Sequence, residues 1–339
     1  MTKIAINGFG RIGKLVFRNI FLNYPNVEIA AVNTSGSVDI AGLAHLLRFD
    51  SVYGRFGKEV KVISPQSEEE LGRLEIEGRQ YPFFGIREPE KIPWSKYGVQ
   101  TVIEATGVFK DQEKAGKHIA AGCNKIVISA PPKDASPIYI LGVNHHEYKG
   151  ENVISNGSCT TNCAAPVIKI INDYFGIEKV TMTTIHAYTS TQNLVDGSHK
   201  DLRRARAAAT NIIPTSTGAA KAVIAAIPSL SGKFSASAVR VPILTGSFSD
   251  FTFVLPKTTT IEEVNNLFIN KSSGEFKNLI FATYDPLVSS DIIGTTYSAI
   301  IDLSLTEVLG GNLLKVYAWY DNEWAYTCRL IEMATFISL

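Results

Sequence analysis

The segment SCTTNC, residues 158–163, holds the side chains best suited to covalent chemistry. It precedes the helical pattern AAPVIKIINDYFG, so Cys159 is predicted to lie at the start of a helix. Free backbone N–H groups and the helix dipole favour a thiolate at such a position. Cys159 is therefore the candidate nucleophile. Cys163, one turn further on, is predicted to be a packed structural thiol.

A metal site is the first alternative for this cysteine pair. No second cysteine pair or histidine cluster completes such a site in the sequence, so we predict no metal. A thiolate nucleophile instead needs a base or an imidazolium partner. His186, in TIHAYTSTQN near the end of a β-rich segment, is the best candidate. Taken alone, His186 is also compatible with a structural role.

A glycine pattern near the N-terminus predicts a dinucleotide site. GFGRIG places Gly8, Gly10 and Gly13 in GxGxxG spacing between an apolar strand and an amphipathic helix. The first glycine permits a tight turn, the second a close approach of the pyrophosphate, and the third helix–strand packing. The phosphate charge would lie at the helix N-terminus. An ordinary glycine-rich turn is the alternative.

The elements around these motifs predict two parts of different fold class. Apolar strands alternate with helices over the first 150 residues or so, which predicts a Rossmann-type, doubly wound parallel α/β sheet. After Asn156, long β-rich segments with few helices predict an α+β part with a largely antiparallel sheet. We expect a dinucleotide-binding domain over 1–157 and 321–339, including a returning C-terminal helix, and a catalytic domain over 158–320.

Composition excludes several classes of function. The 339 residues carry 33 Lys and Arg against 32 Asp and Glu, so no overall field attracts nucleic acid or anionic lipid. No apolar run has the length of a membrane span. The four cysteines do not suggest a disulfide framework. The dinucleotide pattern begins at Asn7 and leaves no room for a leader, so we expect a cytoplasmic protein. The basic run RRAR, 203–206, is either a solvated face or a small-anion site.

Taken together, the motifs resemble the phosphorylating glyceraldehyde-3-phosphate dehydrogenases. The resemblance extends over essentially the whole chain and keeps the family's order of motifs. Its most specific parts are SCTTN and STGAAKAV. The segments that carry it are INGFGRIG, SCTTNC, HAYTSTQN, DLRRARAAATNIIPTSTGAAKAV, RVP and WYDNEWAY.

The resemblance implies a mechanism for the two candidate catalytic residues. Cys159 would attack the aldehyde of D-glyceraldehyde 3-phosphate, and His186 would accept the proton while hydride passes to NAD or NADP. Inorganic phosphate would then release 1,3-bisphosphoglycerate from the thioester. The family also implies a homotetramer, in which the 197–206 loop reaches a neighbouring subunit's cofactor.

The same resemblance implies two anion sites and a set of cofactor contacts. The substrate phosphate would bind Thr189, Thr191 and Arg240. The attacking phosphate would bind Ser158, Thr160, Thr217, Gly218 and Arg206. Hydroxyls, backbone N–H groups and guanidinium groups suit phosphate oxygens. Further cofactor contacts are expected from Arg11, Ile12, Thr106, Ser129 and Asn322.

The sequence departs from the NAD-dependent family pattern at Thr34, where an aspartate would follow the Asn of the second strand. A carboxylate there binds the ribose 2′-OH and repels a 2′-phosphate, whereas threonine removes the repulsion. Thr34, Ser35 and the N–H of Gly36 would then bind a 2′-phosphate. Ser198, where NAD-preferring bacterial relatives commonly have proline, and Arg87 point the same way. We therefore expect NADP to be accepted. The alternative is a turn that drifted while NAD remained the partner.

Two rival functions remain at this point. One is a related aldehyde dehydrogenase that acts, for example, on erythrose 4-phosphate; the intact STGAAKAV and HAYTST argue against it. The other is a binding protein, with RNA or a cell surface as partner, as a second role. Phosphate-dependent, phosphate-independent or absent turnover separates the three.

Overall fold

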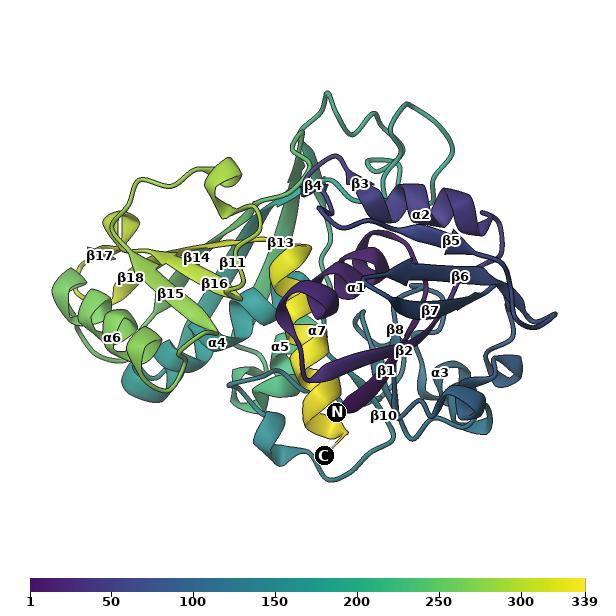
Figure 1. The fold of residues 1–339 in the computed structure, drawn as a ribbon. Helices are drawn as coiled ribbons and strands as arrows, with labels where there is room; N and C mark the ends of the chain where they lie inside the picture. The colour runs from purple at the N-terminus through teal and green to yellow at the C-terminus, as the bar shows by residue number, and fades with distance from the viewer. Residues whose placement is uncertain (339) are drawn as a thin grey trace. The chain divides into compact units, whose positions relative to one another are not determined.

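The computed structural model describes residues 1–338, which form two compact units (Figure 1). Unit 1 comprises residues 1–139 and 147–157 and the chain from Thr327 onward; unit 2 comprises 140–146 and 158–326. Both units contain mixed helix and sheet, as expected for the two predicted fold classes. The functional division of the chain at 157, 158, 320 and 321 stays a prediction.

Unit 1 is built on an eight-stranded sheet. Its six strands from β10 to β7 run parallel, and β6 and β5 extend it as an antiparallel edge. The parallel part confirms the predicted fold class, whereas the antiparallel edge was not predicted. In sheet order the strands are β10 (Val153–Ser155), β9 (Lys125–Ile128), β8 (Thr101–Glu104), β1 (Thr2–Asn7), β2 (Val27–Asn33), β7 (Arg79–Phe84), β6 (Glu70–Ile76) and β5 (Lys61–Ile63). A separate ladder joins β3 (Phe49–Asp50) to β4 (Gly54–Arg55).

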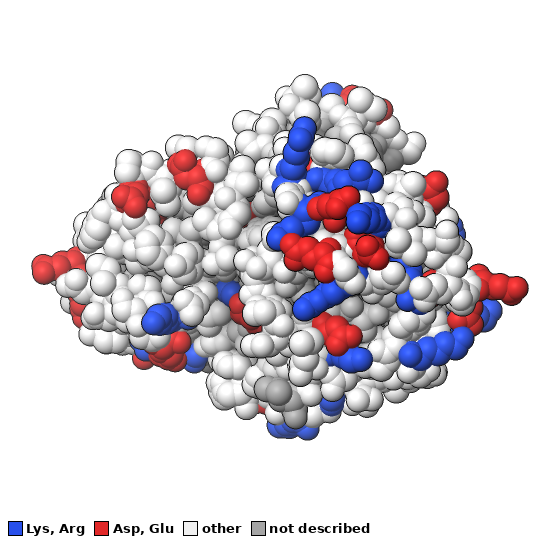
Figure 2. Space-filling model, viewed as in Figure 1, with Lys and Arg blue, Asp and Glu red and all other residues white. Residues whose placement is uncertain are grey.

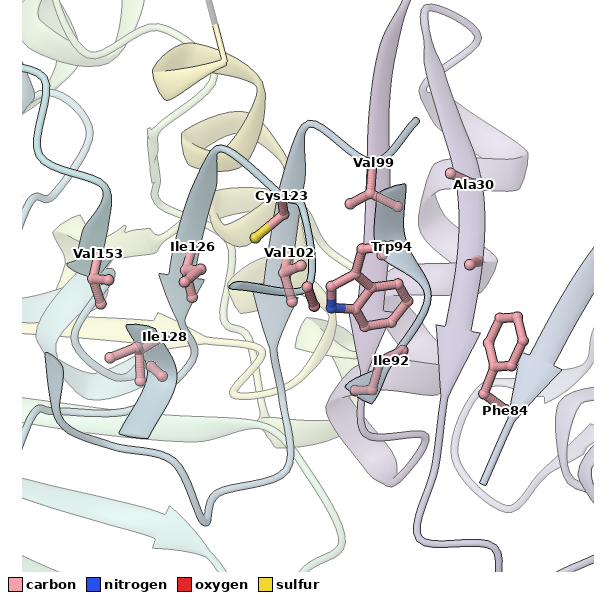
Figure 3. Packing of buried hydrophobic residues seen from close by; sticks show 14 residues of the cluster. Ala30, Phe84, Ile92, Trp94, Val99, Val102, Cys123, Ile126, Ile128 and Val153 are labelled. Atoms are coloured by element: carbon pink, nitrogen blue, oxygen red, sulfur yellow. The ribbon is translucent and has the colours of Figure 1, made fainter. Parts of the chain in front are cut away.

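Helical segments cover both faces of this sheet. Side chains alternate along β1, so Ile6 and Ala5 point to opposite faces. Helix α1 (Arg11–Asn23) approaches Ile6 at its first turn. On the Ala5 face, Trp94 packs among Val102 and other apolar residues (Figure 3). The other helical segments of unit 1 are α2 (Ile40–Arg48), α3 (Gln112–Ala120), η1 (Pro89–Lys91) and η2 (Trp94–Tyr97), and η3 (His145–Glu147) crosses from unit 2 into unit 1.

Unit 2 is built on a second, largely antiparallel sheet, as predicted. Two neighbouring pairs, β11 with β13 and β15 with β16, run parallel. In sheet order its strands are β12 (Ile213–Thr215), β13 (Phe234–Val241), β11 (Lys179–Ala187), β14 (Ser247–Val254), β18 (Leu313–Tyr320), β16 (Ala299–Asp302) and β15 (Ile280–Thr283), with β17 (Glu307–Leu309) paired to β18. Its helical segments are α4 (Cys159–Phe175), α5 (Ala219–Ala226), α6 (Ile261–Ser273), η4 (Pro228–Leu230), η5 (Ser289–Ile292) and η6 (Leu303–Leu305).

The last helix, α7 (Trp324–Ile337), begins in unit 2 and continues into unit 1. Within unit 1 it is joined to α1, because Asn19 donates to Thr327 Oγ1 at 3.1 Å and Tyr24 donates to Glu332 at 3.0 Å. These bonds hold a helix from the far end of the sequence against α1. The assignment of 321–339 to the dinucleotide-binding domain stays a prediction, and residues 321–326 belong to unit 2.

The surface shows no separation of charge on the face drawn in Figure 2, where Lys and Arg side chains lie among Asp and Glu side chains. Over residues 1–338, no helix combines the length and the apolarity needed to cross a membrane.

Replacement of glycine by alanine is expected to have opposite effects on stability at two positions. A Cβ at Gly13 would lie 1.8 Å from the carbonyl oxygen of Gly8, a backbone atom that cannot move aside. A Cβ at Gly116, inside α3, would meet no heavy atom within 4 Å. We expect Gly13→Ala to lower the free energy of unfolding by about 2 kcal/mol or more. Gly116→Ala should raise it by roughly 0.5–1 kcal/mol, because alanine favours the helix.

Denaturant unfolding midpoints of the two variants measure this difference. Equal shifts, or a stabilised Gly13→Ala protein, would contradict the close contact between the glycine turn and α1.

Candidate active site

Cys159 is the first residue of helix α4, as its sequence position predicts. Ser158 is the N-cap and accepts a hydrogen bond from the N–H of Thr161 at 3.1 Å. This cap fixes the first turn of the helix. The thiol is partly buried and lies at the positive end of the helix dipole.

His186 reaches the same point from the end of strand β11. Its Nε2 lies 3.5 Å from Cys159 Sγ, which is hydrogen-bond distance for sulfur. The histidine is 3% exposed, so the strand and its neighbours fix the ring. Strand β11 pairs with β13 in a register that sets His186 beside Arg240. The structure thus brings together the predicted nucleophile, the predicted base and one predicted phosphate ligand.

Burial and the charge of Arg240 control the protonation of this group. Burial raises the pKa of the Cys159 thiol, while the guanidinium of Arg240 and hydrogen bonds from Thr160 lower it. Burial and Arg240 lower the pKa of His186 to about 3. The imidazole is therefore neutral near pH 7 and able to accept a proton. The helix start by itself predicts a lowered thiol pKa for Cys159, but burial outweighs it.

The other ring nitrogen of His186 has two neighbours. Nδ1 lies 2.6 Å from the carbonyl oxygen of Ala187 and 2.5 Å from Nη1 of Arg240. Arg240 Nη1 also donates to the Ala187 carbonyl at 2.8 Å. When Nδ1 donates to Ala187, Nε2 is the acceptor that faces the sulfur. When Nδ1 accepts from Arg240, Nε2 carries the proton. The surroundings therefore accommodate both forms of a proton-transferring imidazole.

Tyr320, at the end of β18, is a member of the site that the sequence did not indicate. Its hydroxyl lies 2.9 Å from Thr160 Oγ1 and 2.8 Å from Thr184 Oγ1, in a position that is 1% exposed. It ties the first turn of α4 to strand β11, on which Thr184 and His186 point to the same face. A tyrosine in an alternating strand is typical of a core, so its sequence carried no signal of this role.

The predicted anion ligands differ in their surroundings. Thr189 and Thr191 lie side by side, with their hydroxyl oxygens 2.8 Å apart. Arg206 is exposed and pairs with Asp196 at 2.8 Å. Thr217 accepts from the N–H of Ala219 at the start of α5, where Gly218 is the N-cap.

Arg204, in the same basic run as Arg206, was not singled out by the sequence. It donates to Thr215 Oγ1 at 2.9 Å and to the Ser216 carbonyl at 3.1 Å, directly before Thr217. Its charge also contributes to lowering the pKa of Arg240. Arg204 is therefore the member of RRAR whose charge acts on Arg240.

Asn322 is held in one orientation. Its Oδ1 accepts from Thr245 Oγ1 at 3.2 Å, from the N–H of Gly246 at 3.1 Å and from Ser247 Oγ at 2.9 Å. With the oxygen so engaged, the amide nitrogen is the end available to donate to a ligand.

In unit 1, a cavity of about 470 Å³ lies at the carboxyl ends of strands β1, β2 and β8. Ligands bind at this edge in open α/β sheets. The lining includes the predicted cofactor residues Gly8, Gly10, Thr34, Ser35, Arg87 and Thr106. It also includes Asn7, Phe9, Asn33, Ser37, Val38, Leu43, Leu46, Ile86, Ala105, Val108 and Phe109.

The glycine turn of this cavity fits a dinucleotide. Gly8 has a φ of +99°, and a Cβ there would lie 2.7 Å from the backbone nitrogen of Thr106. Gly10 caps α1 without a side-chain hydrogen bond, and its Cβ position is open. A diphosphate can therefore approach the helix start closely, as the GxGxxG pattern predicts.

The turn after β2 differs from the prediction that Thr34, Ser35 and the N–H of Gly36 together bind a 2′-phosphate. The hydroxyl of Thr34 accepts from the N–H of Gly36 at 3.1 Å and donates to the Phe84 carbonyl at 3.3 Å. Thr34 and this N–H are thus bonded to each other. Ser35 and Ser37, whose hydroxyls are 2.8 Å apart, remain exposed in the lining together with Arg87.

Six predicted cofactor residues lie outside this lining, namely Asn322, described above, and Arg11, Ile12, Gly13, Ser129 and Ser198. Arg11 pairs with Asp50, and Ile12 and Gly13 continue helix α1. Ser129 follows β9, where its N–H donates to the Glu104 carbonyl at 3.0 Å. Ser198 is an exposed residue of unit 2. Within residues 1–338, no group of three or more His, Cys, Asp or Glu side chains is arranged to hold a metal ion.

Alkylation under native conditions should distinguish Cys159 from the other three cysteines. Cys123, Cys163 and Cys328 are buried, and burial raises the pKa of each thiol, to about 12 for Cys123. We expect iodoacetamide to modify Cys159 alone, at a rate that rises with pH because the thiolate is the reactive form. His186→Asn should slow the reaction at pH 7 and move this rise to higher pH, because the proton acceptor is lost.

Peptide mass mapping over a pH series measures both effects. Rapid modification of Cys163, or an unchanged pH profile in His186→Asn, would contradict the pairing of Cys159 with His186.

Comparison with known proteins identifies the family of the chain. The family model described as "Glyceraldehyde 3-phosphate dehydrogenase, NAD binding domain" matches residues 2–112, and "Glyceraldehyde 3-phosphate dehydrogenase, C-terminal domain" matches residues 158–322. The glyceraldehyde-3-phosphate dehydrogenase of Thermotoga maritima is 48% identical over 334 residues, which cover 98% of each chain. Glyceraldehyde-3-phosphate dehydrogenase 2 of Nostoc sp. is 46% identical, covering 100% of this chain and 99% of the relative.

A chloroplast protein is also similar. Glyceraldehyde-3-phosphate dehydrogenase A, chloroplastic, of Chlamydomonas reinhardtii is 46% identical over 98% of this chain and 87% of its own length. With a family model on each unit and relatives that align over nearly the whole chain, the protein belongs to the glyceraldehyde-3-phosphate dehydrogenase family.

Proposed function

We propose that the protein is an NAD(P)-dependent phosphorylating dehydrogenase that converts D-glyceraldehyde 3-phosphate and inorganic phosphate into 1,3-bisphosphoglycerate. The observation that supports this most directly is the 3.5 Å contact between Cys159 Sγ and His186 Nε2. A thiol beside a neutral imidazole is suited to covalent catalysis on an aldehyde.

Cys159 and His186 carry the chemical steps in this proposal. The sulfur adds to the aldehyde carbon, and the thiol proton passes through His186 Nε2 to the carbonyl oxygen, which gives a hemithioacetal. His186 Nε2 then accepts the hydroxyl proton while hydride leaves the same carbon, and a thioester remains. NAD or NADP, when bound, accepts this hydride. A phosphate oxygen attacks the thioester carbon, the C–S bond breaks, and the sulfur regains the proton from His186. One proton is released to water.

Arg240 has two functions in the proposal. It binds the substrate phosphate with Thr189 and Thr191. Its charge adds to the effect of burial, which keeps His186 neutral, and favours the thiolate of Cys159. The attacking phosphate binds at Ser158, Thr160, Thr217, Gly218 and Arg206. Arg204 is a further candidate for this site, because it lies beside Thr217 whereas Arg206 is paired with Asp196.

The cavity of unit 1 is the proposed cofactor site. The glycine turn at Gly8 and Gly10 holds the pyrophosphate, and Thr106 contributes from the end of β8. Arg11, Ile12 and Ser129 remain proposed contacts outside the lining. The amide nitrogen of Asn322 binds the nicotinamide carboxamide.

Thr34 supports acceptance of NADP as well as NAD. Thr34 carries no carboxylate that would repel a 2′-phosphate. Ser35, Ser37 and Arg87 offer exposed donors in the same lining. Ser198 is a further proposed contact from a neighbouring subunit.

A homotetramer is the proposed assembly. The loop around Ser198 exposes Leu194, Val195, Leu202 and Ile212 to between 69% and 80%, and apolar patches of this kind mark interfaces. Light scattering that shows a fully active single chain would contradict this.

We also propose that the protein acts in the cytoplasm on small molecules, without nucleic acid or membrane as primary partners; recovery with the membrane fraction would contradict it.

Phosphate dependence tests the proposed reaction. With D-glyceraldehyde 3-phosphate and NAD or NADP, we expect steady formation of reduced cofactor only when inorganic phosphate is present, because phosphate releases the acyl group from Cys159. Erythrose 4-phosphate should be a poor substrate. Phosphate-independent steady turnover would favour a related aldehyde dehydrogenase, and no turnover would favour a binding protein. Cys159→Ser is the control for the thiol, and Cys163→Ser should retain most of the activity.

The variant Thr34→Asp tests the basis of NADP acceptance. Aspartate can also accept the N–H of Gly36, so the turn is kept while a negative charge is added. We expect the NADP KM to rise about tenfold or more and the NAD KM to fall or stay level, because only NADP carries a 2′-phosphate.

Thr34→Asn is the matched control, because it has the same size without the charge and should leave the NADP KM within about threefold of the wild-type value. Steady-state kinetics with both cofactors measures the difference. Equal NADP KM values for the aspartate and asparagine variants would show that charge at position 34 does not select the cofactor.

A further inference from the structure

A buried carboxylate lies behind the nucleotide cavity and has no part in the steps above. Glu104 ends strand β8 and is 1% exposed. Taking an ionised carboxylate out of water costs several kcal/mol unless hydrogen bonds compensate. The contacts that compensate Glu104 therefore show what this side chain holds in place.

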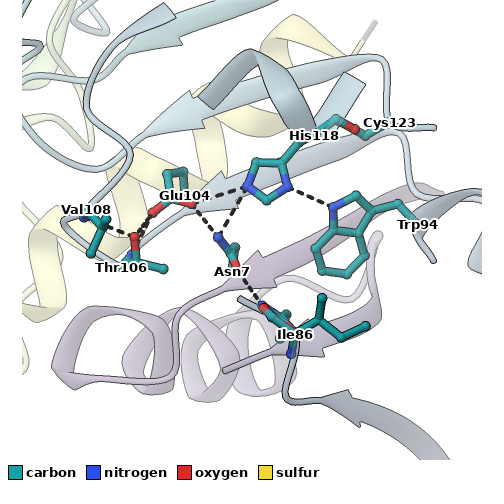
Figure 4. Close-up of polar contacts among 9 residues, drawn as sticks. Asn7, Ile86, Trp94, Glu104, Thr106, Val108, His118 and Cys123 are labelled. Atoms are coloured by element: carbon teal, nitrogen blue, oxygen red, sulfur yellow. Dashed lines mark hydrogen bonds and ion pairs between the residues drawn. The ribbon is translucent and has the colours of Figure 1, made fainter. Parts of the chain in front are cut away.

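One oxygen of Glu104 fixes the loop that follows β8. Oε1 accepts from the N–H of Thr106 at 2.8 Å and from the Thr106 hydroxyl (Figure 4). The same hydroxyl accepts from the N–H of Val108 at 3.0 Å. Thr106 and Val108 both line the cavity, and the backbone nitrogen of Thr106 lies against Gly8 of the glycine turn.

The other oxygen of Glu104 fixes the opposite side of the cavity. Oε2 accepts from Asn7 Nδ2 at 2.5 Å. The Oδ1 of Asn7 accepts from Asn33 Nδ2 at 2.8 Å, and Asn33 bonds both the N–H and the carbonyl of Ile86. Asn7, Asn33 and Ile86 line the cavity as well. A single carboxylate thus connects the ends of β8, β1 and β2 and the loop after β7.

His118 and Trp94 orient this carboxylate from the side away from the cavity. The indole Nε1 of Trp94, which can only donate, lies 3.0 Å from His118 Nδ1. In the neutral ring the proton is therefore on Nε2, which lies 3.3 Å from Glu104 Oε2. His118 and Trp94 are fully buried, and Trp94 is a member of the apolar cluster of Figure 3.

We propose that Glu104 is a positioning residue for dinucleotide binding, held in place by His118 and Trp94. It orders the cavity before the cofactor arrives, so that binding does not have to order Asn7, Asn33 and Thr106. This inference rests on the proposed cofactor site in unit 1 and adds a residue that does not itself touch the ligand.

The variant Glu104→Gln tests the proposal. In glutamine an NH₂ group replaces one of the two carboxylate oxygens. Its N–H donors then face the donors on Asn7 and His118 if Oε2 is replaced, or those on Thr106 if Oε1 is replaced. We expect the Kd for NADH and NAD of the full-length protein to rise about tenfold. The kcat at saturating cofactor and the alkylation rate of Cys159 should stay within about twofold of wild type, because the variant changes cofactor binding rather than the thiol.

Val102→Ala is the matched control. Val102 is a fully buried residue of the same strand in the apolar cluster, and its truncation should lower the unfolding midpoint without touching the polar contacts. We expect its Kd for NADH to stay within about twofold of wild type. Fluorescence titration with NADH and calorimetry with NAD measure both proteins.

The outcomes separate the inference from the proposed cofactor site. Wild-type protein that binds neither NADH nor NAD would overturn the cofactor site itself. Wild-type binding with an unchanged Kd in Glu104→Gln, or an equal rise in Val102→Ala, would overturn the positioning role. If Glu104→Gln does not fold, Trp94→Phe removes the indole donor together with part of a fully buried ring, and its Kd is compared with that of Val102→Ala. It should raise the Kd about threefold, and an unchanged Kd would equally overturn the proposal.

Discussion

The contact between Cys159 Sγ and His186 Nε2 is the constraint on which the proposed catalytic site depends. It requires helix α4 to begin at one residue and strand β11 to end beside it. The cap at Ser158 fixes the helix start, and Tyr320 ties that start to β11. Burial then makes the pair sensitive to one neighbouring charge, that of Arg240. The proposed substrate binding at Arg240 and the proposed proton transfer at His186 would thereby be linked through a single guanidinium group.

The same physical rule operates in both units. Polar side chains at strand ends are buried, and each is compensated by donors or acceptors of fixed direction. In unit 1 these are Asn7, Asn33 and Glu104 at the carboxyl ends of neighbouring strands. In unit 2 Asn322 accepts three hydrogen bonds on one oxygen. Side chains held in this way lose little entropy when a ligand binds, so the fold itself supplies the order that binding needs.

The sequence predicted those features that depend on local spacing. The glycine turn, the helix that starts at Cys159 and the change of sheet type after the first unit all follow from local patterns. Features that depend on burial were not predicted. The raised pKa of Cys159 arises from burial, which local spacing does not show. Tyr320 has the sequence pattern of a core residue. A charged residue within the apolar segment TVIEATG was a signal for Glu104, because a buried acid needs partners. Its partner His118 lies in a different helix, which sequence spacing does not reveal.

The thioester on Cys159 is the central claim, and an acyl-enzyme measurement tests it most directly. The protein is mixed with D-glyceraldehyde 3-phosphate and oxidised cofactor without inorganic phosphate, and reduced cofactor and peptide masses are followed together. We expect a burst of reduced cofactor of about one equivalent per chain, with the acyl group on the peptide that contains Cys159. Added phosphate should remove this group as acyl phosphate. A burst without an adduct on Cys159, or an adduct that phosphate does not release, would contradict the account.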